Sequence, residues 1–374
     1  MSQMVQTENV NAEDVFQKGL ELSQQGAYEG AIAQFEQTIQ LQPGHYDAWN
    51  EKGTVLSHLG RQAEAIACYE TAIKLNSHAP VAYYSLGRAA YGIGQYEKAI
   101  VSFSKVIELE PNFPHAHYCL GLVQYVAGNY QKAVATLQLA LDLQPDFADA
   151  WYTQAFALYS TGRYESAIKH FNKALELKAD YWEAYSGRGD CLRQLGDYEA
   201  AIASYDKALG LKPDDAESWY QWAVCLKSLG RHKHAIVGYD KAISYQPEDS
   251  RFWYGCGSCL LKLGDYQGAI ASYDQAVKFK PDHYEAWFNR GVALKNLERF
   301  EDAIASYDRA IEVRPEDHKA WNNRGSAFLS LERFQDAIAS FNKVLELNPD
   351  DERARQNLTR AMKRLQQAEG AIEQ

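Results

Sequence analysis

The chain of 374 residues contains little that would interrupt helices. Proline is scarce, with ten residues, and good helix formers such as Ala, Leu, Glu, Gln and Lys fill most of the sequence. No run of about 18 apolar residues occurs, so the sequence predicts no segment that spans a membrane. Residues 1–11 have neither a basic start nor an apolar centre, which indicates a flexible tail rather than a secretory signal. We therefore expect a soluble, cytoplasmic protein.

An excess of basic charge is also missing, because the formal net charge is −11. A protein that binds nucleic acid by neutralising phosphates needs a cationic surface. The composition therefore argues against a nucleic-acid partner. The six cysteines are scattered along the chain and do not form a disulfide framework, so we expect reduced thiols.

Motifs that carry chemistry are absent from the sequence. It has no GK[ST] phosphate loop, no HExxH and no GxSxG. Cys256 and Cys259 form a CxxC in the middle of an expected helix, where a packing role fits better than a redox pair. His115 and His117 are two residues apart and point to different faces of a helix, as do the other close histidines. We predict no catalytic residue, no metal site and no cofactor.

One pattern recurs at a fixed spacing of 34 residues over residues 12–351. The ten units have no insertions and begin at Ala12, Tyr46, Pro80, Pro114, Ala148, Trp182, Ala216, Ser250, Tyr284 and His318. Eight of them close with a proline, at Pro43, Pro111, Pro145, Pro213, Pro247, Pro281, Pro315 and Pro349. A period of this length predicts a repeat architecture in which each unit packs only against its neighbours.

Each unit is expected to contain two helices, over roughly positions 1–14 and positions 17–30. The turn between them carries Gly in most units, but Glu298 and Glu332 in the last two. A positive φ is easy for Gly and costly for Glu, so these two turns should keep φ negative or carry some strain. Positions 4, 7, 8 and 11 of the first helix share one arc and should form the buried stripe.

The order aromatic, small, large apolar, Ala, aromatic, Ala, Pro resembles the tetratricopeptide repeat. It is seen in Trp287, Gly291, Leu294, Ala303, Tyr307, Ala310 and Pro315. The resemblance implies an all-α fold, a right-handed α-solenoid superhelix of ten antiparallel helix pairs, whose concave groove binds a peptide or protein partner. It implies no chemistry and names no partner. Residues 352–374 have their own helical pattern, through Ala354, Leu358, Ala361, Met362 and Leu365, and are expected to form a C-terminal capping helix.

Positions 2, 5, 9 and 12 of the first helix lie on another arc, which the resemblance places in the groove. Aromatic residues occupy position 5 in Tyr84, Tyr118, Tyr152, Tyr220, Tyr254 and Phe288, and position 12 in Tyr91, Tyr125 and Tyr159. Aromatic side chains with a polar tip are frequent at binding hot spots. The position-5 side chains have an alternative role, packing between adjacent first helices with only the hydroxyl exposed. The sequence leaves both roles open.

The later units replace these aromatics at position 12 with polar and basic residues. Position 12 carries Arg193, Lys227 and Lys295, and the other candidate partner-binding residues of these units are Lys262, one position later, Lys319 at position 2, and Asn289 and Asn323. They predict either a solvated face or a basic groove for an acidic segment. Asn289, Asn323 and Lys319 match part of a Lys and Asn set that binds chaperone carboxylates in some tetratricopeptide proteins, but the preceding unit lacks its share.

Three arginines, Arg188, Arg290 and Arg324, occupy position 7 near the expected core. A charge there must be paired or reach solvent, so we expect acidic partners on second helices. For Arg290 the candidates are Asp274 and Asp308.

The resulting hypothesis is a non-catalytic, monomeric interaction scaffold that binds a peptide or protein in its groove. Two alternatives remain open. One is an assembly chaperone for a multisubunit complex, including a membrane complex, and the other is a regulatory module of a separate enzyme.

Overall fold

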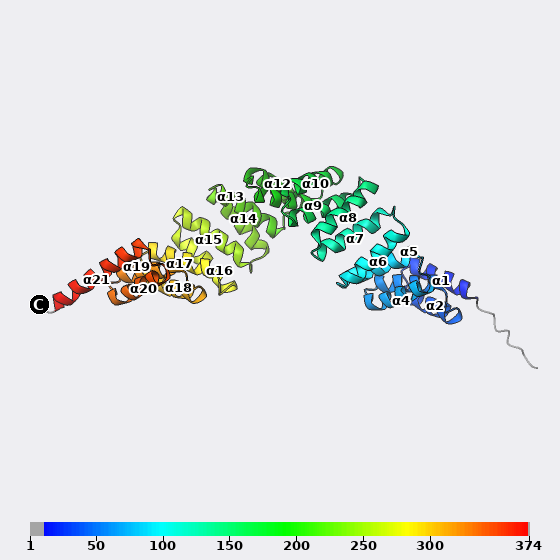
Figure 1. The fold of residues 1–374 in the computed structure, drawn as a ribbon, viewed down its shortest axis with the longest axis horizontal. Helices are drawn as coiled ribbons and strands as arrows, with labels where there is room; N and C mark the ends of the chain where they lie inside the picture. The colour runs from blue at the N-terminus through cyan, green and yellow to red at the C-terminus, as the bar shows by residue number, and fades with distance from the viewer. Residues whose placement is uncertain (1–10, 373–374) are drawn as a thin grey trace, which may run out of the picture. The chain divides into compact units, whose positions relative to one another are not determined.

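The computed structural model describes residues 11–372, with side chains through Glu369. Over this range the regular structure consists of 21 α-helices (Figure 1). The chain divides into two compact units, one ending at Cys191 and the other beginning at Leu192. The boundary between them falls inside α11 (Trp182–Gln194). Apart from Asn11, the predicted tail lies outside the described residues.

The helices follow the 34-residue period. The first helices of the ten repeats are α1 (Ala12–Gln24), α3 (Tyr46–His58), α5 (Pro80–Gly92), α7 (Pro114–Val126), α9 (Ala148–Ser160), α11 (Trp182–Gln194), α13 (Ala216–Ser228), α15 (Ser250–Leu263), α17 (Tyr284–Asn296) and α19 (His318–Ser330). The second helices are α2 (Tyr28–Leu41), α4 (Gln62–Leu75), α6 (Tyr96–Leu109), α8 (Tyr130–Leu143), α10 (Tyr164–Leu177), α12 (Tyr198–Leu211), α14 (His232–Tyr245), α16 (Tyr266–Phe279), α18 (Phe300–Val313) and α20 (Phe334–Leu347). A last helix, α21, covers Glu352–Ile372. The predicted bounds hold to within one residue.

Packing follows the order of the helices along the chain. Consecutive helices contact each other from α1 to α10 and from α12 to α21. First helices of neighbouring repeats also contact each other from α1 to α9 and from α13 to α21, whereas the second helices within each of these two stretches make no such contact. First helices therefore lie closer together than second helices, so each unit curves toward its first helices. These helices form what we call the inner wall.

The small residue at position 8 lets the two helices of a repeat approach closely. A Cβ added to Gly291 would lie 2.6 Å from the ring of Tyr307, and one added to Gly53 would lie 2.7 Å from the ring of Tyr69. Tyr307 and Ala303 are fully buried. A larger residue at position 8 would therefore push the second helix away.

The turn between the paired helices uses a left-handed residue in every repeat. Eight of these residues are Gly, with φ between 73° and 81°, and Glu298 and Glu332 also adopt φ of 57°. The expectation of a negative φ is wrong for both, and the strained alternative is correct. The Arg299 N–H donates to the Leu294 carbonyl at 3.0 Å, and the Glu298 N–H donates to Lys295 at 3.1 Å. The same two bonds close the glycine turns, so they impose this φ on whichever residue is present.

A hydrogen bond ties the start of one repeat to the proline that ends the previous one, at each of the eight prolines of the repeat column. The indole N–H of Trp219 donates to the carbonyl of Pro213 at 2.8 Å. The same bond joins Trp49 to Pro43, Trp151 to Pro145, Trp253 to Pro247, Trp287 to Pro281 and Trp321 to Pro315. His117 and Arg355 bond to Pro111 and Pro349 in the same place. The tryptophan and proline positions of the repeat are therefore linked by one recurring hydrogen bond, which connects neighbouring repeats.

Helix α21 continues the register of the first helices. Ala354 and Ala361 are fully buried at positions 3 and 10 of what would be an eleventh repeat, and α21 packs on α19 and α20. The expected wet face of α21 is exposed, at Arg360, Lys363 and Arg364. Met362, expected in the buried stripe, is 52% exposed, because one residue after Ala361 the helix has turned by about 100°.

Candidate functional site

The arginines at position 7 belong to a series of polar contacts between neighbouring repeats, which we call the polar ladder. Arg290 Nε lies 2.6 Å from Asp274 Oδ1 on the second helix of the preceding repeat, and Arg290 Nη1 donates to Ser306 Oγ at 2.6 Å. The expected pairing of Arg290 is thus confirmed. The same step of 16 residues joins Arg324 to Asp308, Arg188 to Asn172, Trp222 to Asp206, Gln154 to Gln138 and Lys52 to Glu36. These side chains hold neighbouring repeats together.

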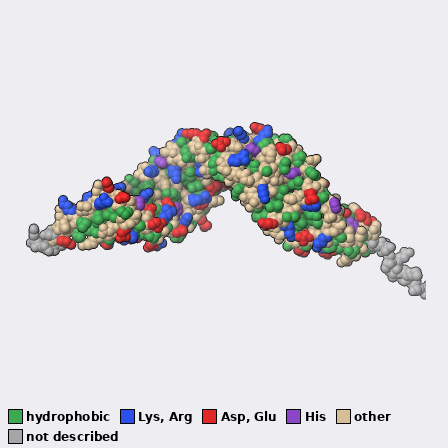
Figure 2. Space-filling model, viewed as in Figure 1, with side chains coloured by type: hydrophobic (Ala, Val, Ile, Leu, Met, Phe, Trp, Pro, Cys, Tyr) green, Lys and Arg blue, Asp and Glu red, His purple; other side chains and the backbone are tan. Residues whose placement is uncertain are grey.

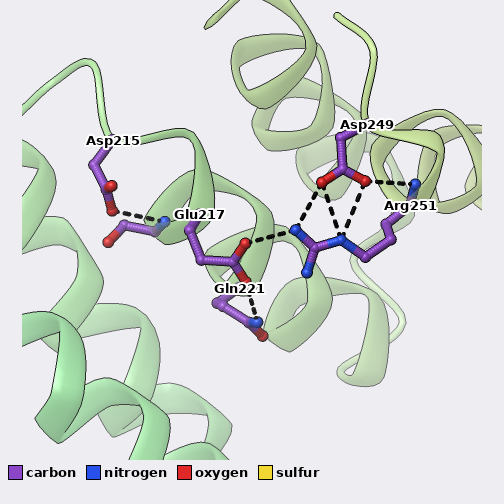
Figure 3. Close-up of polar contacts among 6 residues, drawn as sticks. Asp215, Glu217, Gln221, Asp249 and Arg251 are labelled. Carbon is purple, nitrogen blue, oxygen red and sulfur yellow. Dashed lines mark hydrogen bonds and ion pairs between the residues drawn. The ribbon is translucent and has the colours of Figure 1, made fainter. Parts of the chain in front are cut away.

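Charges at position 2 also pair across repeats. Arg251 Nη2 donates to Glu217 Oε2 of the preceding repeat at 2.8 Å, and to Asp249 Oδ2 at 2.7 Å (Figure 3). Gln221 donates to the other oxygen of Glu217 at 2.7 Å. The guanidinium of Arg251 also lies over the ring of Tyr220, 5.0 Å from its centroid. The guanidinium of Arg251 is therefore already paired with neighbouring side chains of this chain.

The basic residues predicted for the second unit lie in different surroundings. Lys262 and Lys319 are exposed, whereas Arg193, Lys227 and Lys295 are half-buried. Burial, followed by the nearby positive charge of Arg353, lowers the pKa of Lys295. Its ammonium lies 3.5 Å from Asn323 Oδ1. Asn289 Nδ2 lies 3.5 Å from Tyr254 Oη, so part of the predicted set contacts itself.

Most of the aromatic side chains at position 5 contact a ring on the side of the next repeat. The Tyr84 ring lies 5.5 Å from that of Phe113, and Tyr152 stacks on Tyr181 at 4.5 Å between ring centroids. Each partner comes 29 residues later, in the segment that leads into the next repeat. Tyr118 contacts Phe147 and Tyr254 contacts His283 at the same spacing. Tyr220 contacts Phe252 of the next repeat, whereas Phe288 contacts Tyr307 of its own repeat. Burial raises the pKa of Tyr118 to about 12. These rings are half-buried and contact neighbouring aromatic side chains.

Three pockets follow one another along the inner wall of the first unit. The first, of about 170 Å³, is polar and lined by Thr54, Ser57, His58, Gln62, Tyr69, Ser85 and Arg88. The second, of about 260 Å³, is lined by Arg88, Tyr91, Phe103, Cys119, Leu122 and Val123. The third, of about 160 Å³, is lined by Leu122, Tyr125, Tyr152, Thr153 and Phe156. Because Arg88 and Leu122 are each shared by two pockets, the three form one row, which we call the pocket row.

The pocket row contains some of the predicted residues and several that the prediction missed. Tyr91, Tyr125 and Tyr152 line it, whereas Tyr84, Tyr118 and Tyr159 line none of its three pockets. Among the missed residues, Thr54, Arg88, Leu122 and Phe156 all occupy position 9 of their repeats. Position 9 belongs to the arc assigned to the groove, so reading that column would have found them.

A larger and mainly apolar pocket, of about 490 Å³, lies on the side of the second helices. It is lined by Glu70, Ile73, Lys74, Tyr83, Leu86, Glu97, Lys98, Val101 and Ser102. Leu86 stands at position 7, where the polar ladder would otherwise continue, and Glu70 pairs instead with Lys98 at 2.7 Å. The pocket therefore marks an interruption of the ladder.

The described residues offer little for other chemistry. No group of three or more His, Cys, Asp or Glu side chains in residues 11–372 is placed to hold a metal ion. No helix in the same range has the length and apolar character needed to cross a bilayer. All six cysteines lie in this range and none forms a disulfide. On the visible face, basic side chains are interspersed with acidic ones (Figure 2).

Family models match most of the chain. Models of the tetratricopeptide repeat match residues 89–128, and residues 16–80 and 120–181. A tetratricopeptide model described as the C-terminal domain of cilia and flagella-associated protein 70 matches residues 171–374, more than half of the chain. The chain belongs to this family of tetratricopeptide repeat domains. Proteins with such repeats use extended concave surfaces for binding and generally act as protein-interaction scaffolds.

Solved structures share the fold of this tetratricopeptide repeat protein. The C-terminal part of a repeat protein from Cytophaga hutchinsonii has a TM-score of 0.57 at 18% identity, covering 64% of this chain and 99% of that one. A tetratricopeptide repeat protein from Parabacteroides merdae has a TM-score of 0.50 at 19% identity, covering 67% and 98%. YrrB, described as having an unusual peptide-binding site, has a TM-score of 0.47 at 26% identity, covering 50% and 96%. No curated protein matches the chain.

Proposed function

We propose that the protein is a non-catalytic scaffold whose first unit binds an extended peptide segment of a partner protein along its inner wall. The observation that supports this most is the pocket row, in which three pockets are joined through Arg88 and Leu122. A row of small pockets suits successive side chains of an extended chain, whereas a small molecule is usually enclosed by one larger cavity.

The chemistry of the row supports the same conclusion. Two of its pockets present rings and aliphatic groups, among them Tyr91, Phe103, Tyr125 and Phe156. Aromatic side chains provide large contact areas and dominate binding hot spots. Contacts with other rings fix their positions. The ring centroids of Tyr125 and Phe156 are 6.5 Å apart, and Phe156 packs edge-on against Phe171 at 5.1 Å. A preorganised surface loses less entropy on binding.

For the second unit we propose a subsidiary polar surface. This proposal is supported by the half-buried Lys295, whose ammonium lies beside Asn323. The positive charges of Lys295 and Arg353 repel each other there. A carboxylate from the same partner would relieve that repulsion. Lys227, Lys262 and Lys319 extend the same basic character.

The test uses one helix that carries both the variant and its control. Leu122→Lys places a charge in two pockets of the row at once, whereas Val126→Lys changes a residue on α7 that is 40% exposed and lines none of the three pockets. Wild type and both variants are used to capture partners from native extract, which are identified by mass spectrometry. We expect Leu122→Lys to lose partners that Val126→Lys keeps. Identical partner profiles for all three proteins would overturn the proposal.

A further inference from the structure

The first pocket of the row is polar, unlike its neighbours. Helices α3, α4 and α5 contribute to it, and its lining offers four hydroxyls, one amide, one imidazole and the guanidinium of Arg88. Its hydroxyls and amide are largely bonded to one another. Ser57 Oγ donates to Gln62 Oε1 at 3.0 Å, Gln62 Nε2 donates to the Ser57 carbonyl at 3.2 Å, and Tyr69 Oη donates to Thr54 Oγ1 at 3.4 Å. The pocket therefore has a fixed polar floor.

Arg88 lines this pocket, and no carboxylate among the described residues pairs with it. None of the ion pairs found among the described residues includes Arg88. Other arginines of first helices are occupied, Arg290 by Asp274 and Arg251 by Glu217 and Asp249. An exposed guanidinium beside hydroxyl groups matches the geometry of a carboxylate, which it can bind through two parallel hydrogen bonds.

One acidic residue outside the pocket lining interacts electrostatically with residues that line it. Glu51 of α3 does not line it, but it interacts electrostatically with His58 and Tyr69, which do. Burial raises the pKa of the Glu51 carboxyl, and Asn50 Nδ2 donates to it at 3.2 Å. The negative charge of Glu51 opposes an anion in the pocket, so removing this charge should strengthen anion binding.

Arg88 also lines the second pocket, so a group bound to Arg88 is followed directly by an apolar site. Neighbouring helices are about 10 Å apart, and an extended chain advances about 3.3 Å per residue. One repeat therefore corresponds to about three residues of a bound peptide. The pocket row then accommodates one polar side chain and two large apolar ones, at intervals of about three residues.

We infer that the first unit selects peptides with a carboxylate side chain about three residues from the nearer of two large apolar residues, and that Arg88 binds this carboxylate. This inference rests on the proposed function, because it specifies the ligand of the same wall. The guanidinium and the apolar pockets recognise different parts of one segment, so acidic and apolar residues must occur together in the ligand.

The experiment selects random twelve-residue peptides displayed on phage against the immobilised full chain. Wild type should enrich Asp or Glu about three positions from large apolar residues, and Arg88→Glu should enrich Lys or Arg there instead. A selected peptide is then synthesised with an amidated C-terminus. Replacing its acidic residue by the corresponding amide, or Arg88 by Ala, should weaken binding about tenfold or more, the usual effect of losing a charged hydrogen bond. Arg88→Lys should restore part of the affinity, and Glu51→Gln should increase it.

The outcomes separate the inference from the proposed function. Peptides that lose binding with Leu122→Lys but show no acidic preference would overturn the role of Arg88 and leave the groove intact. The same conclusion follows if the acidic preference survives in Arg88→Glu, or if binding requires a free C-terminal carboxylate. No enriched peptide, or enrichment unaffected by Leu122→Lys, would overturn the proposed function itself. Circular dichroism and thermal melting confirm that each variant is folded.

Discussion

Arg290 of α17 and Asp274 of α16 join two consecutive repeats, with Nε and Oδ1 2.6 Å apart. Their neighbours along the chain repeat this arrangement with different chemistry, since Trp222 and Asp206 form a hydrogen bond in the same place. The 34-residue period therefore places the same two positions against each other in successive repeats, and several repeats fill them with different polar pairs.

Replacing Arg290 by Ala should destabilise the protein by about 1 kcal/mol, because it leaves Ser306 and Asp274 without their donor. The charge interaction itself contributes only part of this, since Asp274 is 46% exposed. Urea unfolding of Arg290→Ala, Asp274→Ala and the variant with both substitutions measures the coupling energy between the two side chains. The matched control is Arg299→Ala, which removes an exposed pair with Asp302 and should change stability by less than about 0.5 kcal/mol. Equal effects of Arg290→Ala and the control would contradict a joint between repeats.

Glu298→Gly should stabilise the protein by about 0.5–1 kcal/mol. A left-handed φ costs a residue with a Cβ about 1–2 kcal/mol, and the greater freedom of Gly in the unfolded chain offsets part of that gain. Thermal melting measures the change, and Glu332→Gly should behave alike. Gly264→Ala is the control in the opposite direction. The added Cβ would meet nothing within 4 Å, so the expected loss of stability measures only the cost of the left-handed φ. A destabilised Glu298→Gly would show that the carboxylate contributes more than the backbone strain costs.

Tyr307→Phe should leave stability unchanged or raise it. The Tyr307 hydroxyl is buried and has no hydrogen-bond partner, and an unsatisfied buried hydroxyl costs about 1–3 kcal/mol. Other repeats already have Phe at this position, as in Phe171 and Phe341. Tyr69→Phe is the control, because the Tyr69 hydroxyl bonds Thr54 and its loss should cost about 0.5–1.5 kcal/mol. The hypothesis fails if both variants shift the urea midpoint downward equally.

Stability should fall at alkaline pH through the buried thiols. Burial raises the pKa of Cys259 to about 11, whereas an ordinary thiol has a pKa of about 8.5. The folded state thus holds the proton more tightly than the unfolded state. Its stabilising effect is complete below about pH 8.5 and is lost as the pH rises toward 11. Melting temperatures of wild type and Cys259→Ala across this window should show a shallower decline for the variant, and parallel curves would exclude a contribution from this thiol.

Deleting residues 352–374 should lower the melting temperature and promote self-association. Helix α21 packs on α19 and α20, and Ala361 belongs to a core cluster with Phe328 and Phe341. Without α21 these rings would be exposed as an apolar end. Analytical ultracentrifugation and thermal melting of the shortened chain provide the measurement. A monomeric chain with an unchanged melting temperature would show that α21 is not a cap.

The sequence alone determined the helices, their bounds and the order of repeats, and it limited the acidic partner of Arg290 to Asp274 or Asp308. These features depend on residues within one period or at its direct continuation, where the geometry of an α-helix fixes which positions share a face. The tertiary structure decided three further points. It imposed the left-handed φ on Glu298, because the hydrogen bonds of the turn outweigh the preference of the residue. It packed Tyr84 between repeats, because a ring finds more contact there than at the open wall. It assembled the pocket row around Arg88 and Leu122, because a pocket requires side chains from several repeats to converge, and their spacing along the chain does not specify that convergence.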